Sequence, residues 1–141
     1  GMGVETIRTS GEDFVKDLHD AFMNLEGRFV LTCPSDIPFI STAEIDKFIG
    51  HFEPKRMESL VALVDGNTFD KLDVKPSYTR DHYGSKWVVS GVFIMDREKT
   101  LRDEYLQEFF YETDRMEFAV NVNTPEELDR ARRIFERMHV E

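Results

Sequence analysis

Cysteine and long apolar runs are scarce in this sequence of 141 residues. The single cysteine, Cys33, excludes an internal disulfide, and together with the lack of a signal peptide it predicts a cytoplasmic protein. No apolar run approaches the roughly 20 residues that a membrane-spanning helix needs, so a membrane protein is not expected. The four histidines have no metal-site spacing, which argues against a zinc site.

Positive charge is also scarce, because 18 Lys and Arg stand against 28 Asp and Glu and the formal net charge is −10. Nucleic acid is therefore not an expected partner, since phosphate backbones need a positive surface. The charge does not exclude a small phosphorylated ligand, because a metal ion can bridge the phosphate of the ligand and an acidic protein. Hydrophobic residues make up 40% of the chain, so residues 2–141 are expected to form one domain with its own core.

The apolar patterns alternate along the chain and predict an α/β fold. Runs of apolar residues predict strands, and apolar positions spaced by three or four residues predict helices. The expected strands are 4–9, 28–33, 59–64, 87–95 and 117–122, and the expected helices lie between Gly11 and Gly27 and at 41–52, 100–112 and 124–138, with a long loop at 65–86. Because helices join the first three strands, we expect three layers, with helices on both faces of a mostly parallel sheet.

One acidic residue stands out in the stretch "CPSDIPFIS", residues 33–41. Asp36 follows an expected strand and precedes an expected helix, and open parallel sheets bind ligands beyond the carboxyl ends of their strands. Pro38 stiffens the turn, which suits a Mg²⁺ ligand because Mg²⁺ tolerates little geometric error. The alternative interpretation is that Asp36 is an ordinary turn residue between punctuating prolines.

Three segments resemble the MobA-like nucleotidyltransferase superfamily, which has the glycosyltransferase-A type fold. "CPSDIPFIS" resembles its metal-binding segment, and "VNVNTPEELDRARRIFE" resembles a signature that closes many of these domains. "IRTSGEDFVKDLHDAF" resembles a stretch of archaeal adenosylcobinamide-phosphate guanylyltransferases. These enzymes and the molybdenum cofactor guanylyltransferases are the closest resemblance, and the three segments occur in family order.

The resemblance implies a role for each matching residue. Asp36 would be the catalytic residue that holds Mg²⁺ against the nucleotide phosphates, with Asn123 as a second metal ligand. Gly11 and Asp17 match the nucleotide-binding stretch, and Gly91 matches a glycine near the acceptor site. The implied reaction is Mg²⁺-dependent transfer of a nucleoside monophosphate, with GTP favoured as the nucleoside triphosphate. The acceptor would be a small phosphorylated molecule, such as a cobinamide or molybdopterin type cofactor precursor.

The chain departs from the superfamily at its start. Members of the superfamily begin with a Gly-rich loop that wraps the triphosphate, and nothing like it exists here, so the domain resembles an N-terminally truncated one. Three hypotheses follow: a working nucleotidyltransferase completed by other sequence, a non-catalytic remnant that binds a ligand or protein, and an unrelated α/β protein. In the superfamily the missing first strand lies beside residues 28–33, so the exposed edge predicts a homodimer or a complementing N-terminal chain.

Overall fold

The fold is built from five helices, one 3₁₀ helix and a five-stranded sheet within the described part of the chain. The structure, a computed structural model, describes residues 5–72 and 79–139. The helices are α1 (Phe14–Met23), α2 (Thr42–Gly50), α3 (Gly66–Leu72), α4 (Arg97–Leu101), the 3₁₀ helix η1 (Met116–Phe118) and α5 (Pro125–His139). The strands are β1 (Phe29–Thr32), β2 (Ser59–Asp65), β3 (Thr79–His82), β4 (Ser85–Asp96) and β5 (Glu108–Thr113).

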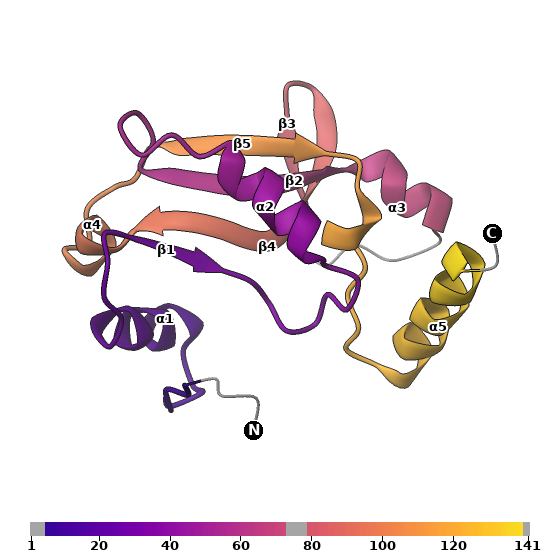
Figure 1. Cartoon of the computed structure of the whole chain (residues 1–141), viewed down its shortest axis with the longest axis horizontal. Coiled ribbons are helices and arrows are strands. Elements are labelled where there is room, and N and C mark those ends of the chain that lie inside the picture. The colour runs from indigo at the N-terminus through magenta and orange to yellow at the C-terminus, as the bar shows by residue number, and fades with distance from the viewer. Residues whose placement is uncertain (1–4, 73–78, 140–141) are drawn as a thin grey trace.

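The sheet has the strand order β1-β4-β2-β5, and β3 pairs with β4 as a hairpin (Figure 1). Strand β2 runs parallel to β5, whereas β4 is antiparallel to β1, β2 and β3. The α/β fold class is thus confirmed, but the expectation of a mostly parallel sheet was wrong. The hairpin between β3 and β4 reverses the chain before β4 enters the sheet, so β4 lies antiparallel between β1 and β2. The carboxyl ends of β1, β2 and β5 therefore share one edge.

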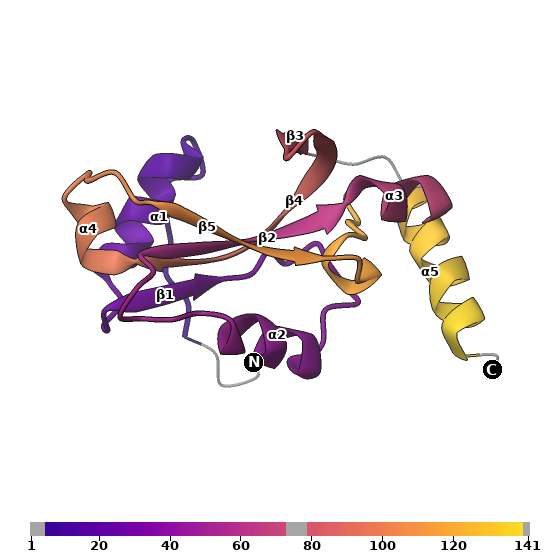
Figure 2. The ribbon, with the colours of Figure 1, turned by 90° about the horizontal axis from the view of Figure 1, so that it is seen from above.

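Helices flank the sheet on both sides. Figure 2 shows α2 on one side and α1 on the other, while α5 lies beyond one end of the strands. The main core lies under α2, where Phe48 packs with buried side chains of β2 and β4 such as Leu60 and Val92. Ser41 caps α2, since its hydroxyl accepts a hydrogen bond from the backbone N–H of Glu44 at 3.3 Å. Within the described residues, no helix has the length and apolar character needed to cross a membrane.

Two secondary-structure predictions for the C-terminal half of the chain were wrong. Residues 108–113 form strand β5 rather than part of a helix, and residues 117–122 hold η1 and an irregular segment rather than a strand. In β5, Phe109 and Tyr111 pack into the α2-side core, while Phe110 contacts Arg80 and His82 of β3. Pairing with β2 and partial burial on both faces outweigh the helical preference of this stretch.

The prediction of a long loop at 65–86 was also wrong in part, because this segment contains α3, β3 and the start of β4. The segment expected as a first strand carries no strand over its described residues 5–9. Helix α1 forms, and the side chain of Asp13 caps it by accepting from two backbone N–H groups. The apolar side chains of α1 are mostly uncovered: Phe22 is fully buried, whereas Phe14 is 74% exposed. Helix α5 begins as expected, with the Thr124 hydroxyl accepting from the backbone N–H of Glu127 at 3.2 Å.

Candidate functional site

The loop from Cys33 to Ser41, which we call the Asp36 loop, leaves the carboxyl end of β1 and leads into α2. Its position is anchored on both sides of Asp36. Ile37 is 2% exposed and belongs to the main core, and Phe39 packs against a second cluster formed with Val120, Ala131 and Ile134. Burial of apolar side chains within the loop holds its backbone in place, so Asp36 is presented from a fixed turn.

The carboxylate of Asp36 has one oxygen paired and one free. Its Oδ2 accepts a hydrogen bond from the Asn121 side-chain amide at 3.5 Å. Its Oδ1 is buried and has no hydrogen-bond partner among the described residues. A buried oxygen of a carboxylate without a partner is costly, and such groups need an explanation such as a bound ion. The free Oδ1 therefore marks this carboxylate as a candidate ligand for a cation.

The second element of the site is the segment between η1 and α5. The backbone N–H of Val122 donates to the carbonyl oxygen of Asp36 at 2.7 Å, which ties this segment to the loop. The resemblance implied that Asn123 is the second metal ligand. In the structure Asn123 is exposed, and its backbone N–H donates to the Glu127 carboxylate at 2.6 Å. The side chain that reaches Asp36 is that of Asn121 instead. The sequence offered no signal to prefer Asn121, because a strand was expected there.

Gly91 supports the Asp36 loop from β4. The pairing of β2 with β4 shifts register between Val61 and Leu63, so β4 bulges where Gly91 lies. Gly91 has a φ of +87°, and a Cβ at this position would lie 3.1 Å from the Pro34 Cγ. The Thr32 hydroxyl also donates to the Gly91 carbonyl at 3.4 Å. Gly91 thus lies against the start of the Asp36 loop, and its expected acceptor role stays a prediction.

Gly11 and Asp17 lie together in a separate turn before and within α1. The Asp17 carboxylate accepts from the backbone N–H groups of Ser10 at 3.1 Å and Gly11 at 2.9 Å, and from the Ser10 hydroxyl at 2.8 Å. Gly11 has a φ of +76°, which favours glycine. Among the described residues, no hydrogen bond or ion pair joins this turn to the Asp36 loop. Gly11 and Asp17 are therefore in contact with each other in the structure. Their nucleotide-binding role stays a prediction.

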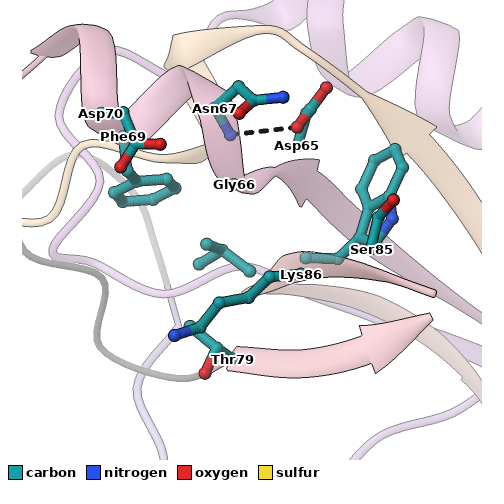
Figure 3. A pocket seen from close by; sticks show the side chains of 10 residues that line it. Asp65, Gly66, Asn67, Phe69, Asp70, Thr79, Ser85 and Lys86 are labelled. Atoms are coloured by element: carbon teal, nitrogen blue, oxygen red, sulfur yellow. Dashed lines mark hydrogen bonds between the residues drawn. The ribbon is translucent and has the colours of Figure 1, made fainter.

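A cavity of about 480 Å³ opens at the carboxyl end of β2 (Figure 3). Residues of β2, α3, β3 and β4 line it: Asp65, Gly66, Asn67, Phe69, Asp70, Thr79, Ser85, Lys86, Trp87 and Val88. Asp65 and Asp70 come from one wall and Lys86 from the opposite wall. The Asp65 carboxylate accepts from the backbone N–H of Asn67 at 3.0 Å. A Cβ on Gly66 would lie 2.5 Å from the Lys86 carbonyl oxygen, so only glycine fits here.

This cavity was missed by reasoning from the sequence, which treated residues 65–86 as a loop. It lies at the edge of the sheet where β1, β2 and β5 end, as does the Asp36 loop. Among the cations of this segment whose side chains the structure describes, Lys86 lines the cavity. Arg80 instead pairs with Glu108 at 3.1 Å and lies over the Phe110 ring, so it stabilises the packing of β3 on β5.

The residues present fit Mg²⁺ in only one way. Within the described ranges, no group of three or more His, Cys, Asp or Glu side chains is placed to hold a metal ion. Mg²⁺ is commonly bound through one or two carboxylates together with substrate phosphates and water, rather than by an all-protein cage. The single carboxylate of Asp36, with its free Oδ1, fits that mode.

The pKa of the Cys33 thiol depends on its surroundings, which include the Asp36 carboxylate. Partial burial raises the pKa of Cys33, and the Asp36 carboxylate raises it further because it disfavours a second negative charge. A thiol with a raised pKa is a poor nucleophile at neutral pH. Cys33 is therefore not expected to act as a catalytic nucleophile.

Comparison with known proteins identifies a family and a fold. The family model described as guanylyl transferase CofC like matches residues 1–131. A solved structure described as a hypothetical transferase from Thermus thermophilus is similar, with a TM-score of 0.66 at 13% sequence identity over 84% of this chain and 71% of that chain. At that identity the likeness shows the fold alone. None of the curated proteins compared with the chain matches it.

Proposed function

Because the chain belongs to the CofC-like guanylyl transferase family, we propose that it transfers a nucleoside monophosphate, with GTP favoured, to a small phosphorylated acceptor. The observation that supports this function most directly is the Asp36 carboxylate, whose Oδ1 is buried without a hydrogen-bond partner among the described residues. The closer resemblance to the cobinamide and molybdenum cofactor enzymes stays a prediction.

In the proposed reaction, an acceptor phosphate oxygen forms a bond to the α-phosphorus of the triphosphate, and the bond to pyrophosphate breaks. The attacking oxygen is already anionic, so no general base is needed and catalysis rests on positioning and charge neutralisation. Mg²⁺ would supply the charge neutralisation on the phosphates. Asp36 would hold the ion, and Asn121 would orient the carboxylate through the bond to Oδ2. Asn123 remains a second proposed ligand.

The acceptor is proposed to bind in the cavity beside Asp65 and Lys86, which opens at the same edge of the sheet as the Asp36 loop. Lys86 supplies a positive charge for a phosphate or carboxylate, and Asn67, Thr79 and Ser85 supply neutral hydrogen-bonding groups. Its volume of about 480 Å³ is in the lower part of the range for small-molecule sites. That volume favours an acceptor of pterin size over one that carries a corrin ring.

A ligand- or protein-binding module without catalysis is the second candidate function. It is supported by the cavity beside Asp65 and Lys86, whose charged and polar lining can hold a ligand whether or not a reaction follows. Catalysis and binding differ in what they predict, because a binding module would be stabilised by a ligand without releasing pyrophosphate.

The test is thermal unfolding of the chain with Mg²⁺ and GTP, followed by an assay for pyrophosphate release with candidate acceptors. A ligand that binds only the folded state at about 100 times its Kd stabilises it by about 2.7 kcal/mol, which raises the melting temperature. We expect this shift with Mg²⁺ and GTP together, a smaller shift with CTP, and none for Asp36→Asn. Asp46→Asn is the matched control, because Asp46 is an exposed carboxylate on α2. A wild-type chain that shows no shift with millimolar GTP and Mg²⁺ would contradict the proposal.

A further inference from the structure

The cavity beside Asp65 and Lys86 holds charged side chains of both signs that do not pair with one another. The carboxylates of Asp65 and Asp70 line it together with the ammonium group of Lys86, and Figure 3 shows Lys86 on the wall opposite the two carboxylates. Among the described residues, none of these three side chains takes part in an ion pair. The charges are therefore available to a ligand, and they specify which groups that ligand must carry.

The carboxylate of Asp65 has a fixed orientation and spare capacity to accept hydrogen bonds. Its Oδ1 accepts from the backbone N–H of Asn67 at 3.0 Å, and its Oδ2 has no hydrogen-bond partner within the described part of the chain. An ionised carboxylate offers roughly four acceptor positions. Most of the acceptor capacity of Asp65 is thus left for N–H groups of a ligand, and the turn to Asn67 keeps the carboxylate in place to receive them.

Trp87 adds an aromatic surface beside Asp65. The two residues are direct partners in the antiparallel pairing of β2 with β4, so their side chains project from the same face of the sheet with Cβ atoms about 4.5–5.5 Å apart. Arg80, which opposes Trp87 from β3, has its guanidinium over the Phe110 ring instead. The face of an indole attracts cations. A positively charged group next to Asp65 is therefore favoured by the carboxylate and by the indole together.

The two walls of the cavity are held at a fixed separation. Gly66 at the start of α3 lies so close to β4 that a Cβ would come within 2.5 Å of the Lys86 carbonyl oxygen. The side chains of Phe69 and Val88, which also line the cavity, are each 4% exposed and belong to the main core. A packed core deforms little. The ligand must therefore present its own charged groups at a matching separation, because the walls cannot close around it.

We propose that the acceptor bound in this cavity is a phosphorylated amine. Its protonated amino group lies against Asp65, Asp70 and the Trp87 ring, and its phosphate faces Lys86. An ammonium group has three N–H donors, so it can bond to both carboxylates, and hydrogen bonds between ionised partners are about twice as strong as neutral ones. The inference rests on the proposed function only in taking the ligand of this cavity to be the acceptor.

The charge balance of the cavity disfavours an acceptor that carries only acidic groups. The lining brings two carboxylates against one ammonium group, in a chain with a net charge of −10. A phosphate monoester adds a charge of about −1.5 to −2 at pH 7, and a carboxylate on the same ligand would lie next to Asp65 or Asp70. Like charges placed side by side oppose binding. An amino group at that position replaces the repulsion with attraction.

The test measures binding without nucleotide, so it does not depend on transfer. Small phosphate monoesters that differ in one group are titrated against the wild type by ligand-observed NMR: O-phosphoethanolamine with an amino group, ethyl phosphate with a methyl group, and phosphoglycolate with a carboxylate. Because all of them share the phosphate, differences in Kd report on the other end of the ligand. We expect O-phosphoethanolamine to bind about tenfold more tightly than ethyl phosphate, and phosphoglycolate to bind most weakly.

Substitutions assign the preference to the named side chains. Asp65→Asn and Asp70→Asn keep the shape of each side chain and remove its charge, so each should reduce the preference for O-phosphoethanolamine, and the double variant should abolish it. Lys86→Gln should weaken binding of every probe alike and keep the preference, because it acts on the shared phosphate. Asp46→Asn is the matched control, since it removes one exposed carboxylate on α2 outside the cavity and should change no Kd.

The results that would overturn the inference differ from those that would contradict the transfer reaction. Equal affinities for the three probes, a preference that the double variant keeps, or no binding of any probe at millimolar concentration would each overturn it. Release of pyrophosphate with an acceptor that has no amino group, and none with an amino acceptor, would support the transfer and overturn the inference. The expected preference in a chain that releases no pyrophosphate with Mg²⁺, GTP and any acceptor would contradict the transfer and support the amino-group site.

Discussion

Replacing Gly91 by alanine is expected to disturb the Asp36 loop through Pro34. Gly91 has a φ of +87°, where side chains are strained, and a Cβ would approach the Pro34 Cγ to 3.1 Å. Pro34 is the second residue of the Asp36 loop, so a shift of its ring moves the turn that carries Asp36. The substitution therefore tests whether β4 positions the carboxylate.

The expected loss of stability follows from these two effects. An L-residue in the left-handed region costs roughly 1–2 kcal/mol, and overpacking against Pro34 adds about 1–3 kcal/mol. Alanine also restricts the unfolded chain, which offsets about 0.4–1 kcal/mol. The free energy of unfolding should thus fall by roughly 1–5 kcal/mol. For a domain of this size, that corresponds to a decrease of roughly 3–20 °C in the melting temperature.

Gly84→Ala is the matched control for backbone strain. Gly84 has a φ of +77°, and a Cβ there would have nothing within 4 Å. Urea unfolding of the two variants therefore separates the strain, which both share, from the contact with Pro34, which only Gly91→Ala makes. Gly91→Ala should also weaken the stabilisation by Mg²⁺ and GTP, whereas Gly84→Ala should retain it.

A double-mutant cycle with Pro34→Ala decides the mechanism. If the Pro34 ring is the obstacle, Gly91→Ala should cost less in the Pro34→Ala background by about 1 kcal/mol or more. Equal costs for Gly91→Ala and Gly84→Ala, with no coupling to Pro34, would refute the reasoning.

Two further predictions concern the charges around the loop. Arg115 pairs with the buried carboxylates of Glu44 at 3.2 Å and Glu117 at 3.1 Å. Arg115 is itself half exposed, and Glu44 keeps Lys47 at 3.5 Å, so Arg115→Met should cost about 1–2 kcal/mol in urea unfolding, mainly because Glu117 loses its partner. An unchanged free energy of unfolding would contradict this. Burial raises the pKa of Cys33 most, and the Asp36 carboxylate raises it further, so Asp36→Asn should lower this pKa and make alkylation of the thiol near pH 8 faster. An unchanged alkylation rate would show that Asp36 does not act on Cys33.

Local sequence patterns were sufficient for elements whose signals lie within a few residues. The starts of α2 and α5 were predicted correctly, and Ser41 and Thr124 cap these helices by accepting from a backbone N–H only three residues away. Strands β1, β2 and β4 were found from their apolar runs. Asp36 was placed correctly after β1 and before α2, since a buried strand followed by a capped helix fixes the position of the turn between them.

Only the tertiary structure decided which segments meet. Strand β5 has a helix-like sequence and becomes a strand because β2 offers its hydrogen-bonding edge and the core accepts Phe109 and Tyr111. The same kind of long-range pairing makes β4 antiparallel and creates the bulge that carries Gly91.

The candidate site depends on such long-range contacts as well. The sequence pointed to Asp36, but the contact with Asn121, 85 residues further along, appears only when the segment before α5 folds against the loop. The cavity beside Asp65 and Lys86 likewise requires α3 and the β3–β4 hairpin to face each other. Capping and burial patterns are local and can be read along the chain, whereas pairing between distant segments depends on which of many competing contacts bury the most surface and satisfy the most hydrogen bonds.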